Sequence, residues 1–262
     1  MRKSNHGKEL IFLWETNAGL KPEEVSLKVV PTTLQISDEM QKRIDTEWEN
    51  TLKDNPHAFD APKWRAEFVN GTYSTLEIYV SPIFYSQHNV MRHIPNQSML
   101  FYPNPLDIGT IQVTADDYIL LGVKGKGSDQ KGLGLLGAGF VERYVDHSGI
   151  TKNPEMLGYV VQKECLEETR YGRKLSFNMN DAKVLAAVFG SNHDTTIGVY
   201  LPIFATSKEV ALNGNEHNDI ILLPNKTEDI ASLLKQGAYK GIPASDYVMG
   251  CLEAFMMYKK GE

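Results

Sequence analysis

Two patterns of hydrophobic and polar positions follow one another along the chain, and each predicts a different kind of element. Polar helix formers follow Ser37, a residue type that favours helix N-caps, and continue to about residue 53. Two further helices are expected over residues 153–171, ended by Gly172, and from Ser245 onwards. Short apolar or alternating runs predict strands near residues 10–14, 26–30, 65–69, 75–80, 109–114, 118–123, 183–189, 198–204 and 219–223.

The order of these elements predicts the fold class. Strands that precede and follow a helix, then more strands and a closing helix, are typical of an α/β protein in layers. Prolines gather near residues 95–110, and we place a boundary there. The chain is thus predicted to have an N-terminal extension of helix and strand, residues 1–108, and a core domain, residues 109–262, that includes the last helix.

Composition supports a folded protein without a membrane segment. The 262 residues are 42% apolar and 23% charged, which is ordinary for a globular domain. No run approaches the roughly 18 apolar residues that a membrane span needs. The apolar run at residues 10–14 is too short for a secretory leader. We therefore expect a cytoplasmic protein with no membrane partner.

The charge and the cysteines exclude some classes of function. A net charge of −6 gives no basic surface for nucleic acid, although one local site can still bind a small phosphorylated ligand. Cys165 and Cys251 are the only cysteines, which excludes a disulfide framework and a cysteine-based zinc site. Cys165 lies among glutamates, which raise the pKa of a thiol, so we expect it to pack rather than react.

The predicted helix around residues 161–172 carries the most informative chemistry. Helical spacing places Glu164, Glu167 and Glu168 within an arc of about 100°. Carboxylates so close repel one another, and a divalent cation such as Mg²⁺ or Mn²⁺ removes that repulsion. A solvated helix face, with Lys163 and Arg170 supplying ion pairs, explains the same residues.

A glycine-rich stretch just upstream favours the metal site. Its glycines, within residues 134–142, let the backbone approach a metal or a phosphate closely. Together with the acidic helix, it resembles the box of the Nudix hydrolases, in which Arg-Glu-apolar-any-Glu-Glu forms the second half. Lys163 to Glu168 match this half, with lysine for arginine. The first half departs, because the family spacing from Gly139 predicts a glutamate where Val145 stands, and Arg170 replaces a glycine.

Several separated segments resemble one divergent branch of that family, the UDP-glucose pyrophosphatases (UDP-sugar diphosphatases). That branch also has an insertion between a Gly-x-x-Glu turn, here Gly139 to Glu142, and the acidic helix. The other matching segments are residues 48–53, 55–56, 59–65 and 114–118.

The resemblance implies an α/β/α Nudix sandwich with an N-terminal α+β extension. It also implies a metal-dependent hydrolase that splits a nucleotide sugar, foremost UDP-glucose or UDP-galactose, into UMP and sugar 1-phosphate. Glu164 and Glu168 become the leading ligands of Mg²⁺, or of Mn²⁺. Glu167 becomes a further ligand or a water-orienting base, and Lys163 positions a carboxylate. A backbone carbonyl near Ala138 or Gly139 completes the metal site.

Substrate-binding residues are less defined. Lys63, Trp64 and Arg65 are candidates for a platform that stacks on a base or sugar and meets phosphate. The alternative is a turn whose aromatic residue packs the extension on the core. By resemblance, Glu142 is a candidate for the displaced acid of the first half of the box. Glu216 is a candidate loop carboxylate for the metal, although a solvated loop explains it equally well.

Other functions stay open or are excluded. The glycines of residues 132–137 match G-x-G-x-x-G but lack the strand and helix that a dinucleotide site requires. His193 and Asp194 resemble a base pair in sequence only, and we assign them no role. A Nudix-like module that binds a nucleotide or protein without turnover is the main alternative, and a hydrolase of another nucleotide such as ADP-ribose is the second. The oligomeric state is left open.

Overall fold

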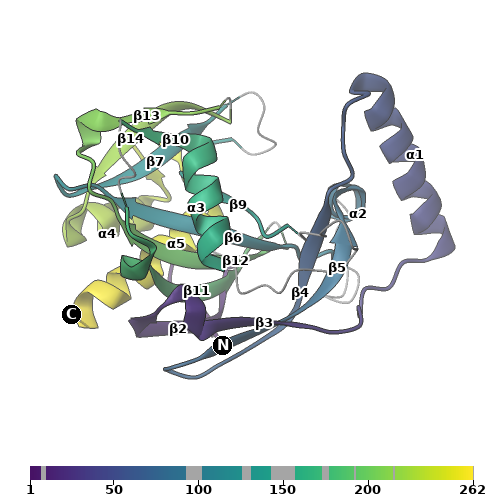
Figure 1. The fold of residues 1–262 in the computed structure, drawn as a ribbon, viewed down its shortest axis with the longest axis horizontal. Coiled ribbons are helices and arrows are strands. Elements are labelled where there is room, and N and C mark those ends of the chain that lie inside the picture. Colours follow the sequence, from purple (N-terminus) through teal and green to yellow (C-terminus); the bar gives the residue numbers. More distant parts are fainter. Residues whose placement is uncertain are drawn as a thin grey trace.

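A computed structural model describes residues 1–6, 10–92, 102–125, 131–142, 157–172, 177–191, 193–214 and 216–261. Within these residues the protein has the predicted α/β class, with a nine-stranded mixed sheet and five helices (Figure 1). The main sheet has the order β1-β2-β11-β12-β6-β7-β14, with β8 beside β7 and β9 beside β6. Its strands are β1 (Arg2–Lys3), β2 (Ile11–Leu20), β6 (Leu106–Val113), β7 (Tyr118–Lys124), β8 (Leu133–Leu135), β9 (Ala138–Phe140), β11 (Lys183–Phe189), β12 (Thr195–Pro202) and β14 (His217–Pro224).

Helices cover both faces of this sheet. On β6, Ile108 belongs to the hydrophobic cluster that also contains α3 (Leu157–Glu168), whereas Ile111 belongs to the cluster of α4 (Thr227–Gln236) and α5 (Asp246–Gly261). Alternate residues of a strand point to opposite faces, so the two clusters are two separate core layers. The arrangement is a sandwich of helix, sheet and helix.

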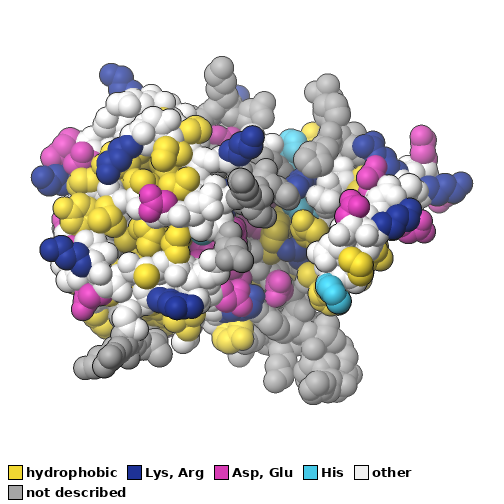
Figure 2. All heavy atoms as spheres, turned by 90° about the horizontal axis from the view of Figure 1, so that it is seen from above, with side chains coloured by type: hydrophobic (Ala, Val, Ile, Leu, Met, Phe, Trp, Pro, Cys, Tyr) yellow, Lys and Arg dark blue, Asp and Glu magenta, His cyan; other side chains and the backbone are white. Residues whose placement is uncertain are grey.

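A second, three-stranded sheet lies beside the main one, at the right in Figure 1. It consists of β3 (Val25–Val29), β5 (Leu76–Phe84) and β4 (Pro62–Gly71), in that order, with α2 (Tyr85–Met91) next to it and α1 (Asp38–Asp54) at the outer end of the molecule. The Ser37 side chain accepts a hydrogen bond from the N–H of Met40, which confirms the predicted start of α1. Both kinds of charge cover this end of the molecule (Figure 2), as expected for a helix with one buried residue, Ile44.

The main sheet takes strands from both sides of the predicted boundary at residues 108 and 109. That boundary falls inside β6, and β2 pairs with β11. The parallel pairing of β12 with β6 joins segments about ninety residues apart, which no local pattern reveals. None of the described helices is long and apolar enough to cross a membrane.

Several elements differ from the predicted ones. The acidic helix ends at Glu168, because Thr169–Tyr171 forms β10 and pairs with β13 (Val210–Leu212). The expected helix start at residues 153–154 lies outside the described residues. The sequence patterns did not reveal α2, α4, β8 or β9, and the predicted strand at 198–204 begins earlier, at Thr195. The remaining short pair is β15 (Ala238–Tyr239) with β16 (Ile242–Pro243).

Candidate functional site

The end of α3 brings Glu168 against the turn between β8 and β9. Its carboxylate Oε2 accepts a hydrogen bond from the N–H of Gly137 and lies 3.4 Å from the nitrogen of Ala138. Gly137 has a φ of +74°, and a Cβ atom there would lie 2.5 Å from the Sγ of Cys165. Only glycine fits this backbone and this approach. The glycine-rich turn therefore holds a buried carboxylate of the predicted site.

Glu164 approaches the same turn one helical step away. A Cβ atom on Gly139 would lie 2.3 Å from the Oε2 of Glu164, so the missing side chain makes room for this carboxylate. The Glu164 side chain is only 12% exposed. Burial raises its pKa to about 7, against the opposing effect of Lys163. A nearby cation would stabilise the charged form of this carboxyl group.

Lys163 already supplies one cation to this cluster. Its Nζ lies 3.3 Å from the Oε1 of Glu164 and 3.5 Å from carboxylate oxygens of Glu142 and Glu167. The lysine thus contacts three of the predicted acids at once, as a positioning residue would. Glu167 is 57% exposed, and it lies farther from the glycine turn than its two neighbours on the helix.

The start of β14 adds Glu216 and His217 to Glu168. Ligand atoms of these three side chains lie within 4.8 Å of one another, so together they could hold a metal ion. The Nε2 of His217 is 3.3 Å from the Oε1 of Glu168. His217 is buried, and a Cβ atom on Gly122 would lie 2.1 Å from its Nδ1, so a glycine makes room for the ring.

The donor atoms fit a hard divalent cation. Carboxylate oxygens are the ligands that Mg²⁺ and Mn²⁺ prefer, and a neutral imidazole suits Mn²⁺ as well. Glu164 lies against Gly139, and Glu168 lies within ligand distance of Glu216 and His217. The N–H of Ala138 points toward Glu168, and the role of a backbone carbonyl near Ala138 or Gly139 as a metal ligand stays a prediction.

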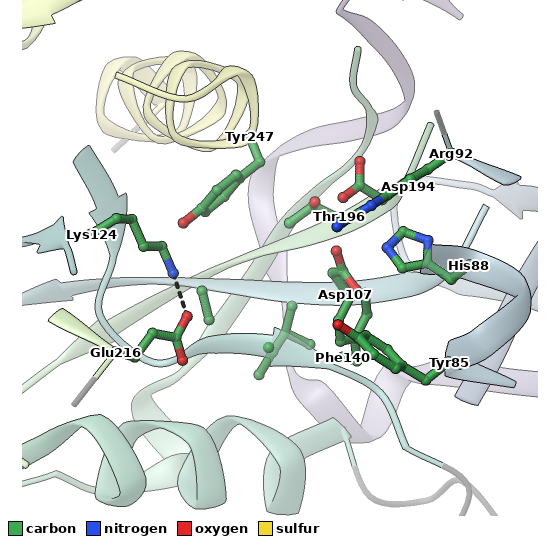
Figure 3. A pocket seen from close by; sticks show the side chains of 13 residues that line it. Tyr85, His88, Arg92, Asp107, Lys124, Phe140, Asp194, Thr196, Glu216 and Tyr247 are labelled. Carbon is green, nitrogen blue, oxygen red and sulfur yellow. Dashed lines mark hydrogen bonds and ion pairs between the residues drawn. The ribbon is translucent and has the colours of Figure 1, made fainter. Parts of the chain in front are cut away.

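A cavity of about 290 Å³ opens beside this cluster. Lys124, Glu216 and Tyr247 line one end, where the Nζ of Lys124 lies 2.6 Å from Glu216 (Figure 3). The pKa of Lys124 is raised: burial lowers it, but Tyr247 and Glu216 more than compensate. Lys124 is therefore a charged group next to the acidic cluster, suited to meet phosphate oxygens.

The other end of the cavity has a different character. Asp107 and Asp194 lie there beside His88 and Arg92, as Figure 3 shows. Asp107 is at the start of β6, and Asp194 directly precedes β12. Because Thr196 pairs with Asp107 in the parallel register, the two strands bring both acids to the same edge of the sheet.

Lys63 lies close to both acidic groups. Its Nζ is 3.2 Å from the centroid of the Phe140 ring. Burial lowers the pKa of Lys63 to about 8, although the charges of Asp107, Glu142 and Glu164 raise it. The structure thus brings Lys63, a predicted substrate-binding residue, to the site. It lies there against Phe140, the last residue of β9.

Trp64 and Arg65 do not form the expected platform. Trp64 is 3% exposed and belongs to the core cluster that contains α3. The Arg65 guanidinium is buried and contacts Glu67, Thr33 and the backbone oxygen of Tyr102. The alternative role, packing the extension on the core, agrees with both positions, because a buried indole cannot stack on a ligand.

The Trp64→Ala variant is expected to lose about 3–5 kcal/mol of the free energy of unfolding, because it removes a buried aromatic side chain. Denaturant unfolding measures this loss. The Trp64→Phe variant, which keeps most of the packing, should leave the KM of any substrate unchanged. A KM that rises several-fold in Trp64→Phe, with stability intact, would support the predicted stacking of Trp64 on a ligand.

Sequence reasoning missed several lining residues. Lys124 lies in β7 and Tyr247 in α5, two elements that were predicted from their apolar residues, so these polar side chains were not singled out. His217 was visible only as part of a polar cluster before a strand. Asp107 did leave a signal, because a carboxylate inside an otherwise apolar strand needs a reason to be there.

Comparisons with known proteins find only distant structural similarities. No protein-family model matches the chain, and no curated protein matches it. A solved bifunctional NMN adenylyltransferase/ADP ribose pyrophosphatase from Francisella tularensis, complexed with AMP and a manganese ion, is 13% identical with a TM-score of 0.39. The match covers 64% of this chain and 44% of that one.

A second solved structure, Tm1382, is described as belonging to the Nudix hydrolases. It is 12% identical with a TM-score of 0.35, and the match covers 81% of this chain and 96% of that one. Both TM-scores are below 0.5, so these similarities assign the chain to no family.

Proposed function

We propose that this protein is a metal-dependent hydrolase of a nucleoside diphosphate linked to another group, with UDP-glucose or UDP-galactose as the leading substrate. One observation carries the proposal. The carboxylates of Glu164 and Glu168 lie against a glycine turn, and Glu168 forms a possible metal site with Glu216 and His217, beside a cavity lined by a charged lysine. The resemblance of the acidic helix and the N-terminal segments to UDP-glucose pyrophosphatases supports the choice of substrate.

The residues fit the chemistry of diphosphate cleavage. A bound Mg²⁺ or Mn²⁺ would lower the pKa of an attacking water and offset the charge of the phosphates. Glu168, Glu216 and His217 would hold the ion, with Glu164 as a further ligand by resemblance, and the N–H groups at Gly137 and Ala138 keep Glu168 in place. Lys124 would meet a phosphate oxygen at the cavity entrance. No nucleophilic side chain is needed, and burial raises the pKa of Cys165 to about 12, which makes its thiol unreactive.

The proposal is tested by assaying the protein with UDP-glucose, UDP-galactose, ADP-ribose and a dinucleoside polyphosphate. We expect UMP and sugar 1-phosphate from the UDP-sugars with Mg²⁺ or Mn²⁺ present. A chelator should abolish the product, and added metal should restore it, because the carboxylates alone repel a diphosphate.

Two results would replace the proposal. Faster hydrolysis of ADP-ribose than of either UDP-sugar would move the substrate to another nucleotide. A rise in melting temperature with Mg²⁺ and UDP-glucose, without any product, would identify a module that binds the nucleotide and does not turn it over. The second result has a basis in the structure, since Lys163 already pairs with Glu164 and Glu167.

A further inference from the structure

The far end of the cavity contains two carboxyl groups, those of Asp107 and Asp194. The parallel register of β6 and β12 brings them to the same end of the sheet, and both side chains are half-buried. Burial raises the pKa of both groups, and for Asp107 the next largest cause is the charge of Asp194. Two carboxylates in this position repel each other, which favours a proton on one of them.

One carboxyl oxygen of the pair makes no hydrogen bond to the described residues. Among the described residues, the Oδ1 of Asp107 is shielded from solvent and has no hydrogen-bond partner. A buried acceptor left in this state destabilises the protein unless a ligand or a water satisfies it. Asp107 lines the cavity, as do Asp194 and Thr196 beside it (Figure 3). The position of these groups points to a ligand that brings hydrogen-bond donors.

The charges around the pair restrict the class of that ligand. Lys63 and Arg92 both act on the pair electrostatically, so its remaining negative charge is already compensated and a cationic ligand is not required. Asp246 and Glu164 add negative charge nearby, which disfavours a phosphate at this end. An uncharged group with several hydroxyls supplies donors for carboxylate oxygens and acceptors for the cationic side chains.

The aromatic side chains at this end, Tyr85, His88 and Phe140, already pack against one another and against Lys63. The Phe140 ring has the Nζ of Lys63 3.2 Å from its centroid, and the His88 ring meets it edge-on at 5.3 Å. Stacking needs a free ring face, and this ring is already covered on one side and flanked on another. The nucleobase is therefore better placed outside this end of the cavity.

We propose that Asp107 and Asp194 form the subsite for the hydroxyl-bearing ring attached to the second phosphate, and that they select a sugar over other diphosphate esters. This inference rests on the proposed function, because the same cavity joins the acidic cluster to the carboxyl pair. A diphosphate between Lys124 and the acidic cluster places its next group toward Asp107. The pair acts as a specificity determinant and takes no part in the bond cleavage.

The test compares two substrates with a six-membered ring on the second phosphate: UDP-glucose and the cyclohexyl ester of UDP, which lacks the hydroxyls, the hydroxymethyl group and the ring oxygen of the sugar. The parent protein is expected to prefer UDP-glucose at least about 10-fold in kcat/KM, since a site built for hydroxyls rejects a ring without them. In Asp107→Asn and in Asp194→Asn, this preference should fall by about 10-fold, the factor of one net hydrogen bond. The exposed Asp181→Asn is the matched control and should keep the parent preference.

The outcomes separate the two proposals. No hydrolysis of either ester would overturn the proposed function, and the inference with it. Hydrolysis of both esters at equal kcat/KM by the parent would overturn the inference alone. An equal fall in kcat/KM for both esters in the two variants would also overturn the inference, because a purely structural role gives that result. If Asp107→Asn fails to fold, Asp194→Asn and the parent preference still decide.

Discussion

The Glu168→Gln variant is expected to lower kcat for UDP-glucose by at least about 100-fold, by analogy with the loss of one electrostatic stabiliser in other enzymes. Glutamine has nearly the same shape but no charge. It can still accept the hydrogen bonds of Gly137 and Ala138, so the fold around the turn should persist. Glutamine lacks the negative charge that Glu168 contributes next to Glu216 and the His217 ring, where the metal ion is expected. Steady-state kinetics at saturating Mg²⁺ measures the loss.

The matched control is Glu228→Gln, which makes the same chemical change on the exposed first turn of α4. It should keep the parent kcat, and both variants should unfold within a few degrees of the parent protein. If Glu168→Gln hydrolysed UDP-glucose at the parent rate, Glu168 would not be a ligand, and the acidic cluster would have a structural role. A loss matched by Glu228→Gln would indicate a general effect of charge.

Local patterns predicted the elements that a helix cap or an apolar run specifies. The helix after Ser37 and the strand over residues 183–189 match the structure closely, because a cap and an apolar run specify them within a few residues. The short strands β8 and β9 escaped notice, since three residues rich in glycine carry no periodicity. Their position depends on pairing with β7 and β6.

The acidic cluster was likewise predictable only in part from the local sequence, because the rest depends on contacts between distant segments. Helical spacing alone placed Glu164 and Glu168 on one face, and the glycines upstream indicated a close approach. Which of the three acids is buried could not be predicted, because it depends on how α3 packs on β9. Asp107 and Asp194 meet only through a parallel strand pair, so no spacing along the chain relates them.

The segment with Trp64 and Arg65 shows where residue type misleads. Aromatic and basic side chains are typical both of ligand platforms and of buried turns. The difference lies in a partner elsewhere in the chain: Arg65 finds Glu67 and Thr33, and Trp64 finds the core. Its neighbour Lys63 instead lies opposite Glu142 in an isolated β-bridge and is affected by the charges of the site acids.

The Gly139→Ala variant is expected to lower kcat/KM by about 100-fold while the melting temperature changes by only a few degrees. The added Cβ atom would lie 2.3 Å from the Oε2 of Glu164, so this carboxylate must move. It is the far end of a flexible side chain, and its displacement therefore disturbs the fold little. A shift of about 1 Å in a catalytic group costs on the order of 100-fold in rate. Kinetics and thermal unfolding of the same sample separate the two effects.

Two other glycines make the comparison decisive. Gly158→Ala adds the same atom on α3, where the nearest neighbour is 3.7 Å away, and should keep the parent kcat/KM. Gly137→Ala meets a positive φ and the buried Sγ of Cys165, so it should lose stability as well as activity. Activity at the parent level in Gly139→Ala would mean that Glu164 need not approach the turn. Activity lost only together with stability would mean that Gly139 serves the fold, because a displaced carboxylate alone leaves the sandwich intact.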